Sequence, residues 1–151
     1  MNLLLVLFAL LAVAFVVRTF WLARAETRPA DFRAALKAGT AVLIDVREPP
    51  EWTSGVAKNA ALLPLSDLRG SRVQWNSFLG KNRGKQLLVY CRSGRRSASA
   101  AAQLRREGLA ALNAGSLNAL DRAGWPVCKA RRCPRSAQVS PHNGIPPTRS
   151  P

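Results

Sequence analysis

The chain carries the sequence Leu87-Leu88-Val89-Tyr90-Cys91-Arg92-Ser93-Gly94-Arg95-Arg96-Ser97. Its first half is an apolar run that ends in a cysteine, which is typical of a buried strand. A short loop with a glycine and three arginines follows, and the alanine-rich residues 97–107 then predict a helix closed by Gly108. A helix that begins directly after a strand points its free N–H groups and its positive end at the loop between them.

Cys91 is expected at that junction, where N–H dipoles and nearby positive charge stabilise a thiolate. Arg92, Arg95 and Arg96 add positive charge that favours the thiolate and any anionic substrate beside it. The alternative is a small buried core residue, the commoner role of a cysteine at a strand end. Three adjacent cations would not stabilise a purely apolar packing site. We therefore interpret Cys91 as a catalytic nucleophile.

The rest of the domain alternates between strand-like and helix-like segments. Strands are predicted at 41–46, 60–63, 86–91 and 109–113. Helices are predicted at 30–37, 66–79, 97–107 and 116–123, with Gly70 weakening the second of them. This alternation predicts an α/β fold with a parallel sheet covered on both faces. The length of the chain allows one such domain, which we place at residues 29–127.

Two polar residues are expected at the same edge of the sheet as Cys91. Ligands of open α/β sheets bind at the carboxyl ends of the strands. Asp45 and Arg47 lie at the end of the strand predicted over 41–46. They would either form an ion pair that fixes the loop or contact the substrate, and the sequence leaves both interpretations open.

Residues 1–23 are set apart by their apolar composition. Residues 1–17 contain no charged side chain, and a helix needs at least about 17 residues to span a membrane. We therefore expect a single-pass inner-membrane anchor at 1–23. The domain would be cytoplasmic, because the arginines after this segment favour that side. The alternative is a signal peptide, with the domain exported to the periplasm.

The net charge of +15 bears on the partners of the chain. A basic surface beside a membrane is attracted to anionic lipid headgroups. The arginines are scattered rather than interleaved with aromatic residues, which argues against specific nucleic-acid binding. The basic, proline-rich residues 128–151 lack apolar periodicity and are expected to form a disordered tail.

The two cysteines of this tail have several possible roles. The chain has 3 cysteines, an odd number that argues against a dedicated disulfide framework. Cys128 and Cys133 could form a small disulfide, act as a resolving pair for Cys91, or be two plain thiols. No metal site is expected, since His142 is the one histidine that could join them.

Several motifs in a fixed order give the chain a resemblance to a known family. They are Leu43-Ile44-Asp45-Val46-Arg47-Glu48-Pro49, Trp52, Gly55, Ala61-Leu62-Leu63-Pro64-Leu65, Val89-Tyr90-Cys91-Arg92-Ser93-Gly94-Arg95-Arg96-Ser97, Asn113-Ala114-Gly115-Ser116-Leu117 and Gly124-Trp125-Pro126-Val127. Over about residues 29–127 the sequence resembles the rhodanese family of sulfurtransferases. It is similar above all to the small single-domain bacterial members.

This resemblance implies a rhodanese-like fold, a five-stranded parallel sheet flanked by helices, here preceded by one N-terminal hydrophobic helix. It implies that Cys91 takes a sulfane sulfur from a small anionic donor such as thiosulfate and becomes a persulfide. Cyanide, or a thiol acceptor such as a thioredoxin-like protein, would then remove that sulfur. The loop would bind the donor through Arg92, Ser93, Gly94, Arg95 and Arg96. No cofactor is expected.

The chain departs from the family pattern at one position. Many members have Gly-His-Ile where this chain has Gly55-Val56-Ala57. No Cys–His pair is therefore available within the domain, and activation of Cys91 would have to be electrostatic. Attack of a thiolate on sulfur needs no general base, so this departure is compatible with sulfur transfer.

Two other functions compete with this interpretation. Cysteine phosphatases have five residues between the cysteine and the arginine, whereas Arg96 follows Cys91 after four. The shorter loop favours a single sulfur atom over a phosphate. The second alternative is a non-catalytic rhodanese-like binding or regulatory module at the membrane. Members of that kind commonly lack the loop cysteine, which this chain has.

Overall fold

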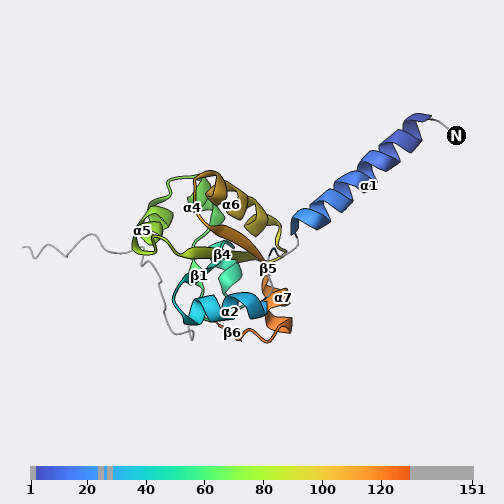
Figure 1. Ribbon diagram of the computed structural model, residues 1–151. Coiled ribbons are helices and arrows are strands. Elements are labelled where there is room, and N and C mark those ends of the chain that lie inside the picture. Colours follow the sequence, from blue (N-terminus) through green and yellow to red (C-terminus); the bar gives the residue numbers. More distant parts are fainter. Residues whose placement is uncertain (1–2, 24–25, 27–28, 130–151) are drawn as a thin grey trace, which may run out of the picture.

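The computed structural model describes residues 3–23, 26 and 29–129. At the centre of the domain lies a four-stranded sheet in the spatial order β3-β1-β4-β5 (Figure 1). Its strands are β1 (Ala41–Asp45), β3 (Ala61–Leu62), β4 (Gln86–Cys91) and β5 (Ala111–Ser116). Every neighbouring pair is parallel, so the carboxyl ends of the strands meet at one edge. Asp45 pairs with Tyr90 there, directly beside Cys91.

The predicted α/β fold with a parallel sheet is confirmed, but the expected number of five strands is wrong. Strand β2 (Val56–Ala57) pairs antiparallel with β6 (Val127–Cys128) in a separate two-stranded sheet, rather than extending the central one. The Tyr90 hydroxyl accepts a hydrogen bond from the Ala57 N–H at 3.0 Å. This bond fastens the small sheet to the main one.

Helices cover both faces of the central sheet (Figure 1). One face carries α2 (Pro29–Lys37) and α7 (Leu117–Arg122), and the other carries α4 (Leu65–Arg69), α5 (Val73–Lys81) and α6 (Arg95–Arg106). Alternate side chains of β4 pack on opposite faces of the sheet. Leu87 and Val89 pack in the core with α4, α5 and α6, whereas Leu88 and Tyr90 pack in the core with α2 and α7. This two-sided burial explains the unbroken apolar run in the sequence.

The helix predicted at 66–79 is divided into α4 and α5. The chain turns at Gly70, and Arg72 then has a positive φ of 58°. The carboxylate of Asp67 accepts hydrogen bonds from the N–H groups of Gln74 and Trp75, both at 3.1 Å. Asp67 therefore satisfies free N–H groups in the first turn of α5, which makes two short helices stable in place of one.

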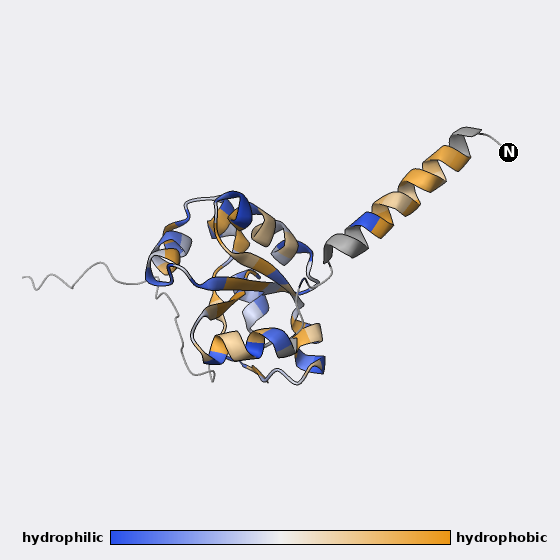
Figure 2. Cartoon of the chain, in the orientation of Figure 1, coloured by the Kyte–Doolittle hydropathy of each residue, from blue (hydrophilic) through white to orange (hydrophobic). Residues whose placement is uncertain are grey.

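Helix α1 (Leu3–Ala23) extends away from the domain (Figures 1 and 2). Its apolar side chains are exposed from Val6 to Val17, and Arg18 places a charge within the helix. Within the residues that the structure describes, no helix combines the length and the apolarity that a membrane crossing requires. The predicted anchor at 1–23 is therefore not supported, and neither is the inner-membrane location that depended on it.

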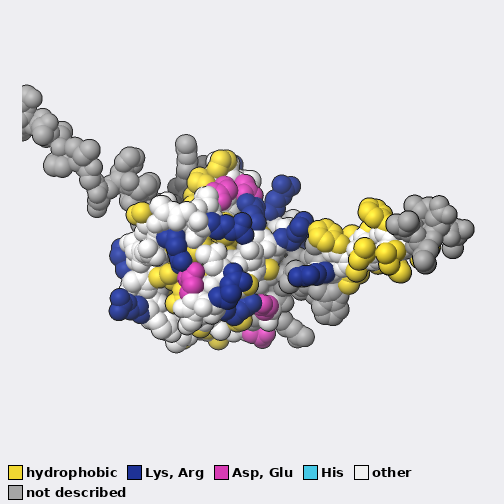
Figure 3. Space-filling model, turned by 90° about the horizontal axis from the view of Figure 1, so that it is seen from above, with side chains coloured by type: hydrophobic (Ala, Val, Ile, Leu, Met, Phe, Trp, Pro, Cys, Tyr) yellow, Lys and Arg dark blue, Asp and Glu magenta, His cyan; other side chains and the backbone are white. Residues whose placement is uncertain are grey.

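The surface charge of the domain is dispersed. On the face shown in Figure 3, Lys and Arg side chains are spread over the domain with acidic groups between them. Near the C-terminal end, Cys128 is disulfide-bonded, whereas Cys91 has a free thiol. Cys133 and most of the tail predicted at 128–151 lie outside the described residues.

Candidate active site

The loop after β4 places Cys91 at the start of α6. Cys91 is the last residue of β4, residues 92–94 form the loop, and α6 begins at Arg95. Gly94 precedes the helix with a φ of 88°, a conformation that glycine adopts without steric cost. This turn brings the Gly94 N–H to 3.1 Å from Cys91 Sγ. The first turn of α6 contains no acidic residue, so no carboxylate of the helix itself competes with the sulfur for its positive end.

Two buried polar side chains, those of Ser97 and Asn113, hold this loop in place through hydrogen bonds. The Ser97 hydroxyl, in the first turn of α6, lies 3.5 Å from Cys91 Sγ and 2.7 Å from Asn113 Oδ1. Asn113, on β5, donates from Nδ2 to the Gly94 carbonyl at 3.2 Å and accepts at Oδ1 from the Gly115 N–H at 3.0 Å. Both side chains are fully buried. One hydrogen-bond network therefore fixes the loop, the helix start and the end of β5 together.

Opposing effects set the pKa of Cys91. Burial is the largest and raises the pKa, because a thiolate loses hydration in the interior. Hydrogen bonds from the Ser97 hydroxyl and from the backbone N–H groups of Ser97, Ser93 and Gly94 lower it. Together they outweigh burial, so the pKa of Cys91 lies below its ordinary value. A thiol with a lowered pKa is more ionised at neutral pH.

We predict that Ser97→Ala raises the pKa of Cys91 by about one unit. A hydrogen bond to a charged group contributes about 1.5–3 kcal/mol, and one pKa unit corresponds to about 1.4 kcal/mol. The lower end of this energy range applies here, because the Ser97 hydroxyl proton is shared between Cys91 Sγ and Asn113 Oδ1. The rate of alkylation by iodoacetamide, followed against pH, measures this shift. Ser99→Ala is the matched control, since Ser99 is exposed on α6 and accepts a hydrogen bond from Arg69. Equal profiles for the two variants would contradict the prediction.

The three loop arginines differ in their surroundings. Arg96 forms a two-fold ion pair with Glu51 of α3 (Pro49–Trp52), at 2.6 and 2.7 Å. This pair raises the pKa of Arg96 and lowers the pKa of Glu51 to about 2. The negative charge of the Cys91 thiolate contributes to the raised pKa of Arg96. Arg92 and Arg95 are exposed, and neither forms an ion pair within the described part of the chain.

The sequence led us to expect that three arginines stabilise the thiolate. In the structure, hydrogen bonds provide most of this stabilisation. Backbone N–H groups and the Ser97 hydroxyl dominate the lowering of the Cys91 pKa. The reason is geometric, because Arg92 and Arg95 extend into solvent while Arg96 is neutralised by a carboxylate. Solvent-exposed charges interact weakly with a buried group.

Asp45 and Arg47 form the ion pair that the sequence left as one of two interpretations. The Arg47 Nη2–Asp45 Oδ2 distance is 2.7 Å, and Arg47 Nε lies 3.0 Å from both carboxylate oxygens. Arg47 also donates to the Gly55 carbonyl at 2.6 Å and to the Glu51 carbonyl at 3.2 Å. The side chains are 0% and 3% exposed. The pair therefore fixes the segment that contains α3 and Glu51, the partner of Arg96.

Sequence reasoning did not single out Ser97, Asn113 or Glu51 as parts of the site. Ser97 and Asn113 both lie within motifs of the family resemblance, but their roles depend on contacts between separate elements. Asn113 had one usable indication, since it is a polar residue in a segment predicted to be a buried strand. Buried polar groups are nearly always hydrogen-bonded, so such a residue points to a specific partner.

Comparison with known proteins agrees with this architecture. The family model of the rhodanese-like domain matches residues 28–122. An uncharacterised protein, slr1261 from Synechocystis, is 37% identical over 97 residues, which cover 63% of this chain and 51% of that protein. The chain thus spans about half the length of this curated relative.

Solved structures show the same fold. The rhodanese-related protein from Thermoplasma volcanium has a TM-score of 0.57 and 30% identity, with 70% of this chain and 98% of that chain covered. The human single-domain sulfurtransferase TSTD1 has a TM-score of 0.53 and 24% identity, with 66% and 96% covered, and this likeness concerns the fold alone. With a family match over most of its length and a loop of this geometry, the chain belongs to the rhodanese-like domain family.

Proposed function

We propose that this protein is a sulfurtransferase and that Cys91 is its nucleophile. The observation that carries the proposal is the Gly94 N–H directed at Cys91 Sγ, in a loop that lowers the pKa of the thiol against the effect of burial. A structural cysteine in an apolar core would have a raised pKa instead. The hydrogen bonds around this sulfur therefore favour a reactive thiolate over a packing role.

The reaction proposed has two displacements at sulfur. The Cys91 thiolate attacks the outer sulfur of thiosulfate, the sulfur–sulfur bond of thiosulfate breaks, and sulfite leaves with the electron pair. Cyanide or an acceptor thiolate then attacks the outer sulfur of the Cys91 persulfide. Thiocyanate or the acceptor persulfide leaves, and the Cys91 thiolate is regenerated. Neither step requires a general base, in keeping with a domain that contains no histidine.

The loop supplies groups suited to a small anionic donor. Arg92 and Arg95 are exposed and have no carboxylate partner in the described residues, so they are available to attract thiosulfate. The backbone N–H groups of Ser93 and Gly94 face the sulfur and would also hold the negative charge of a persulfide. Arg96 interacts with the Cys91 thiolate, and its ion pair with Glu51 would hold it in place beside the sulfur.

The burial of Cys91 favours one competing function, a rhodanese-like binding module without turnover. Cys91 has 0% exposure, so a donor can reach the sulfur only if the surrounding atoms move. Incubation of the full chain with thiosulfate, followed by mass spectrometry, separates the two functions. A sulfurtransferase gains the mass of one sulfur atom on the peptide that contains Cys91. A protein that stays unmodified, with a thiol inert to iodoacetamide, is a binding module.

The pH dependence of this reaction follows from the lowered pKa of Cys91. The thiolate exists above that pKa, so the rate of Cys91 alkylation should rise with pH around a midpoint that lies below that of an ordinary thiol. The measurement is the pseudo-first-order alkylation rate between pH 5 and 10. Glutathione under the same conditions serves as the reference thiol. A midpoint at or above that of glutathione would show that burial outweighs the hydrogen bonds.

A further inference from the structure

A cavity lies at the opposite edge of the sheet from Cys91. It has a volume of about 620 Å³, within the usual range of small-molecule sites of about 300–1,000 Å³. Ala41, the first residue of β1, and Lys85, which directly precedes β4, both line it. Cys91 is the last residue of β4. The cavity and the candidate active site are therefore separated by the length of this strand.

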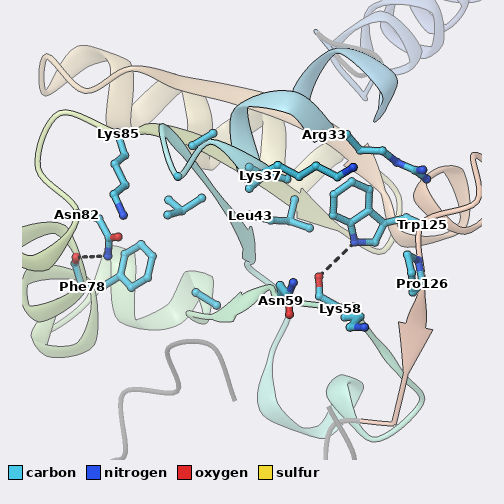
Figure 4. Close-up of a pocket in the computed structure, with 15 residues that line it drawn as sticks. Arg33, Lys37, Leu43, Lys58, Asn59, Phe78, Asn82, Lys85, Trp125 and Pro126 are labelled. Atoms are coloured by element: carbon cyan, nitrogen blue, oxygen red, sulfur yellow. Dashed lines mark hydrogen bonds between the residues drawn. The ribbon is translucent and has the colours of Figure 1, made fainter. Parts of the chain in front are cut away.

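The floor and the ends of the cavity are apolar. Leu43 lies between Phe78 at one end and Trp125 at the other (Figure 4). The Trp125 indole N–H donates to the Lys58 carbonyl at 3.2 Å, and its ring packs against Phe32 with 5.5 Å between the ring centroids. This end of the cavity is therefore built on fixed contacts and exists without a ligand.

Arg33 strengthens the same end. Its guanidinium carbon lies 5.2 Å from the centre of the Trp125 ring, and Nη2 donates to the carbonyls of Ala123 and Gly124 at 3.1 and 2.7 Å. A cation over the face of a tryptophan is attracted by the negative charge of the ring face. Arg33 thus adds a fixed positive charge to the wall.

The rim is positively charged and contains no acidic side chain. Lys37, Lys58 and Lys85 line the opening, and the residues around the cavity include neither aspartate nor glutamate. Among the described residues, the four ion pairs all use arginine, so none of these lysines is neutralised by a carboxylate. The cavity therefore has an apolar lining and three ammonium groups without a carboxylate partner at its opening, which favours a ligand that carries a negative charge.

We infer that this cavity binds a small amphipathic anion, a molecule with an apolar body and a single carboxylate, sulfonate or phosphate group. The apolar body would lie along the apolar lining to which Leu43, Phe78 and Trp125 belong, and the anionic group would meet the lysines at the rim. A compact anion such as thiosulfate has no apolar body to cover this floor. Residues 130–151 contain four arginines and no acidic residue, so like charge opposes their binding here. The inference stands independently of the proposed sulfur transfer.

The test is photolabelling of the full chain with decanoic acid that carries a diazirine at its apolar end. Labelled peptides are mapped by mass spectrometry. We expect the label on peptides that contain Leu43 or Phe78. Lys85→Glu should reduce labelling of these peptides at least fivefold, because it puts a negative charge at the rim. Lys81→Glu, at the exposed end of α5 and outside the cavity, is the charge-matched control and should leave labelling unchanged.

The methyl ester of the same probe separates a charge-dependent site from simple apolar adhesion. Helix α1 exposes apolar side chains and should take up the acid and the ester alike. The cavity peptides should be labelled by the acid at least fivefold more than by the ester. Equal labelling by both probes, or labelling confined to α1, would overturn the inference. Labelling that an acidic peptide blocks and free decanoate does not would also overturn it, in favour of a protein partner.

Discussion

Cys91→Ser should abolish sulfur transfer, with the rate of thiocyanate formation from thiosulfate and cyanide falling by at least about 10³-fold. The serine hydroxyl has a similar size but is not ionised at neutral pH, so it cannot displace sulfite. Cys91 is fully buried, and the Gly94 N–H has an oxygen acceptor in the variant, so the fold should be retained. Near-UV circular dichroism and thermal unfolding check that retention. After incubation with thiosulfate, the variant should show no added sulfur at position 91.

Arg92→Ala provides the comparison for this loss. Arg92 is exposed in the same loop, and its removal takes away one positive charge without touching the sulfur. We expect a higher KM for thiosulfate in this variant, with kcat largely kept. Turnover by Cys91→Ser close to that of the unchanged chain would show that another group carries the sulfur, and the proposed mechanism would have to be abandoned.

Asp45→Ala should lower the free energy of unfolding by about 3–5 kcal/mol, the usual cost of leaving a buried charge unpaired. Asp45 accepts hydrogen bonds from Nε and Nη2 of Arg47, and both side chains are buried. The variant removes the carboxylate and leaves the guanidinium with backbone carbonyls as its remaining partners. Urea unfolding followed by tryptophan fluorescence measures the change.

The double variant Asp45→Leu/Arg47→Met distinguishes a structural pair from a substrate contact. Replacing both charges by apolar groups of similar size is often neutral for stability, so the double variant should recover much of the loss. If Asp45→Ala were as stable as the unchanged chain but did not transfer sulfur, Asp45 would act on the substrate instead.

The elements that carry the site could be predicted from the sequence because their patterns are local. Strand β4 coincides with the predicted residues 86–91, since an apolar run buried on both faces has no competing interpretation there. The helix predicted at 97–107 begins two residues earlier, at Arg95, because Gly94 already provides the turn that starts it. Placing Cys91 and Asp45 at one edge required the further step that neighbouring strands are parallel, which the structure confirms.

Long-range pairings could not be predicted in the same way. Strand β2 has two residues and pairs with β6 at the other end of the domain, so no periodicity reveals it. The contact between Ser97 and Asn113 joins a helix to a strand, and neither residue has a pattern that names its partner. The expected anchor at 1–23 rested on apolar composition and on a length of at least about 17 residues, whereas no helix among the described residues combines the length and the apolarity that a crossing requires.

The alternation of β4 between two cores has a consequence for mutational scanning. Leu87 and Val89 serve one core and Leu88 and Tyr90 the other, so polar replacements at all four positions should be poorly tolerated. A scan scored by cell growth would record a continuous block of sensitive positions that runs into Cys91. Most of that block reports packing, and a screen for protein abundance would separate it from the one position whose loss leaves the protein folded but chemically silent.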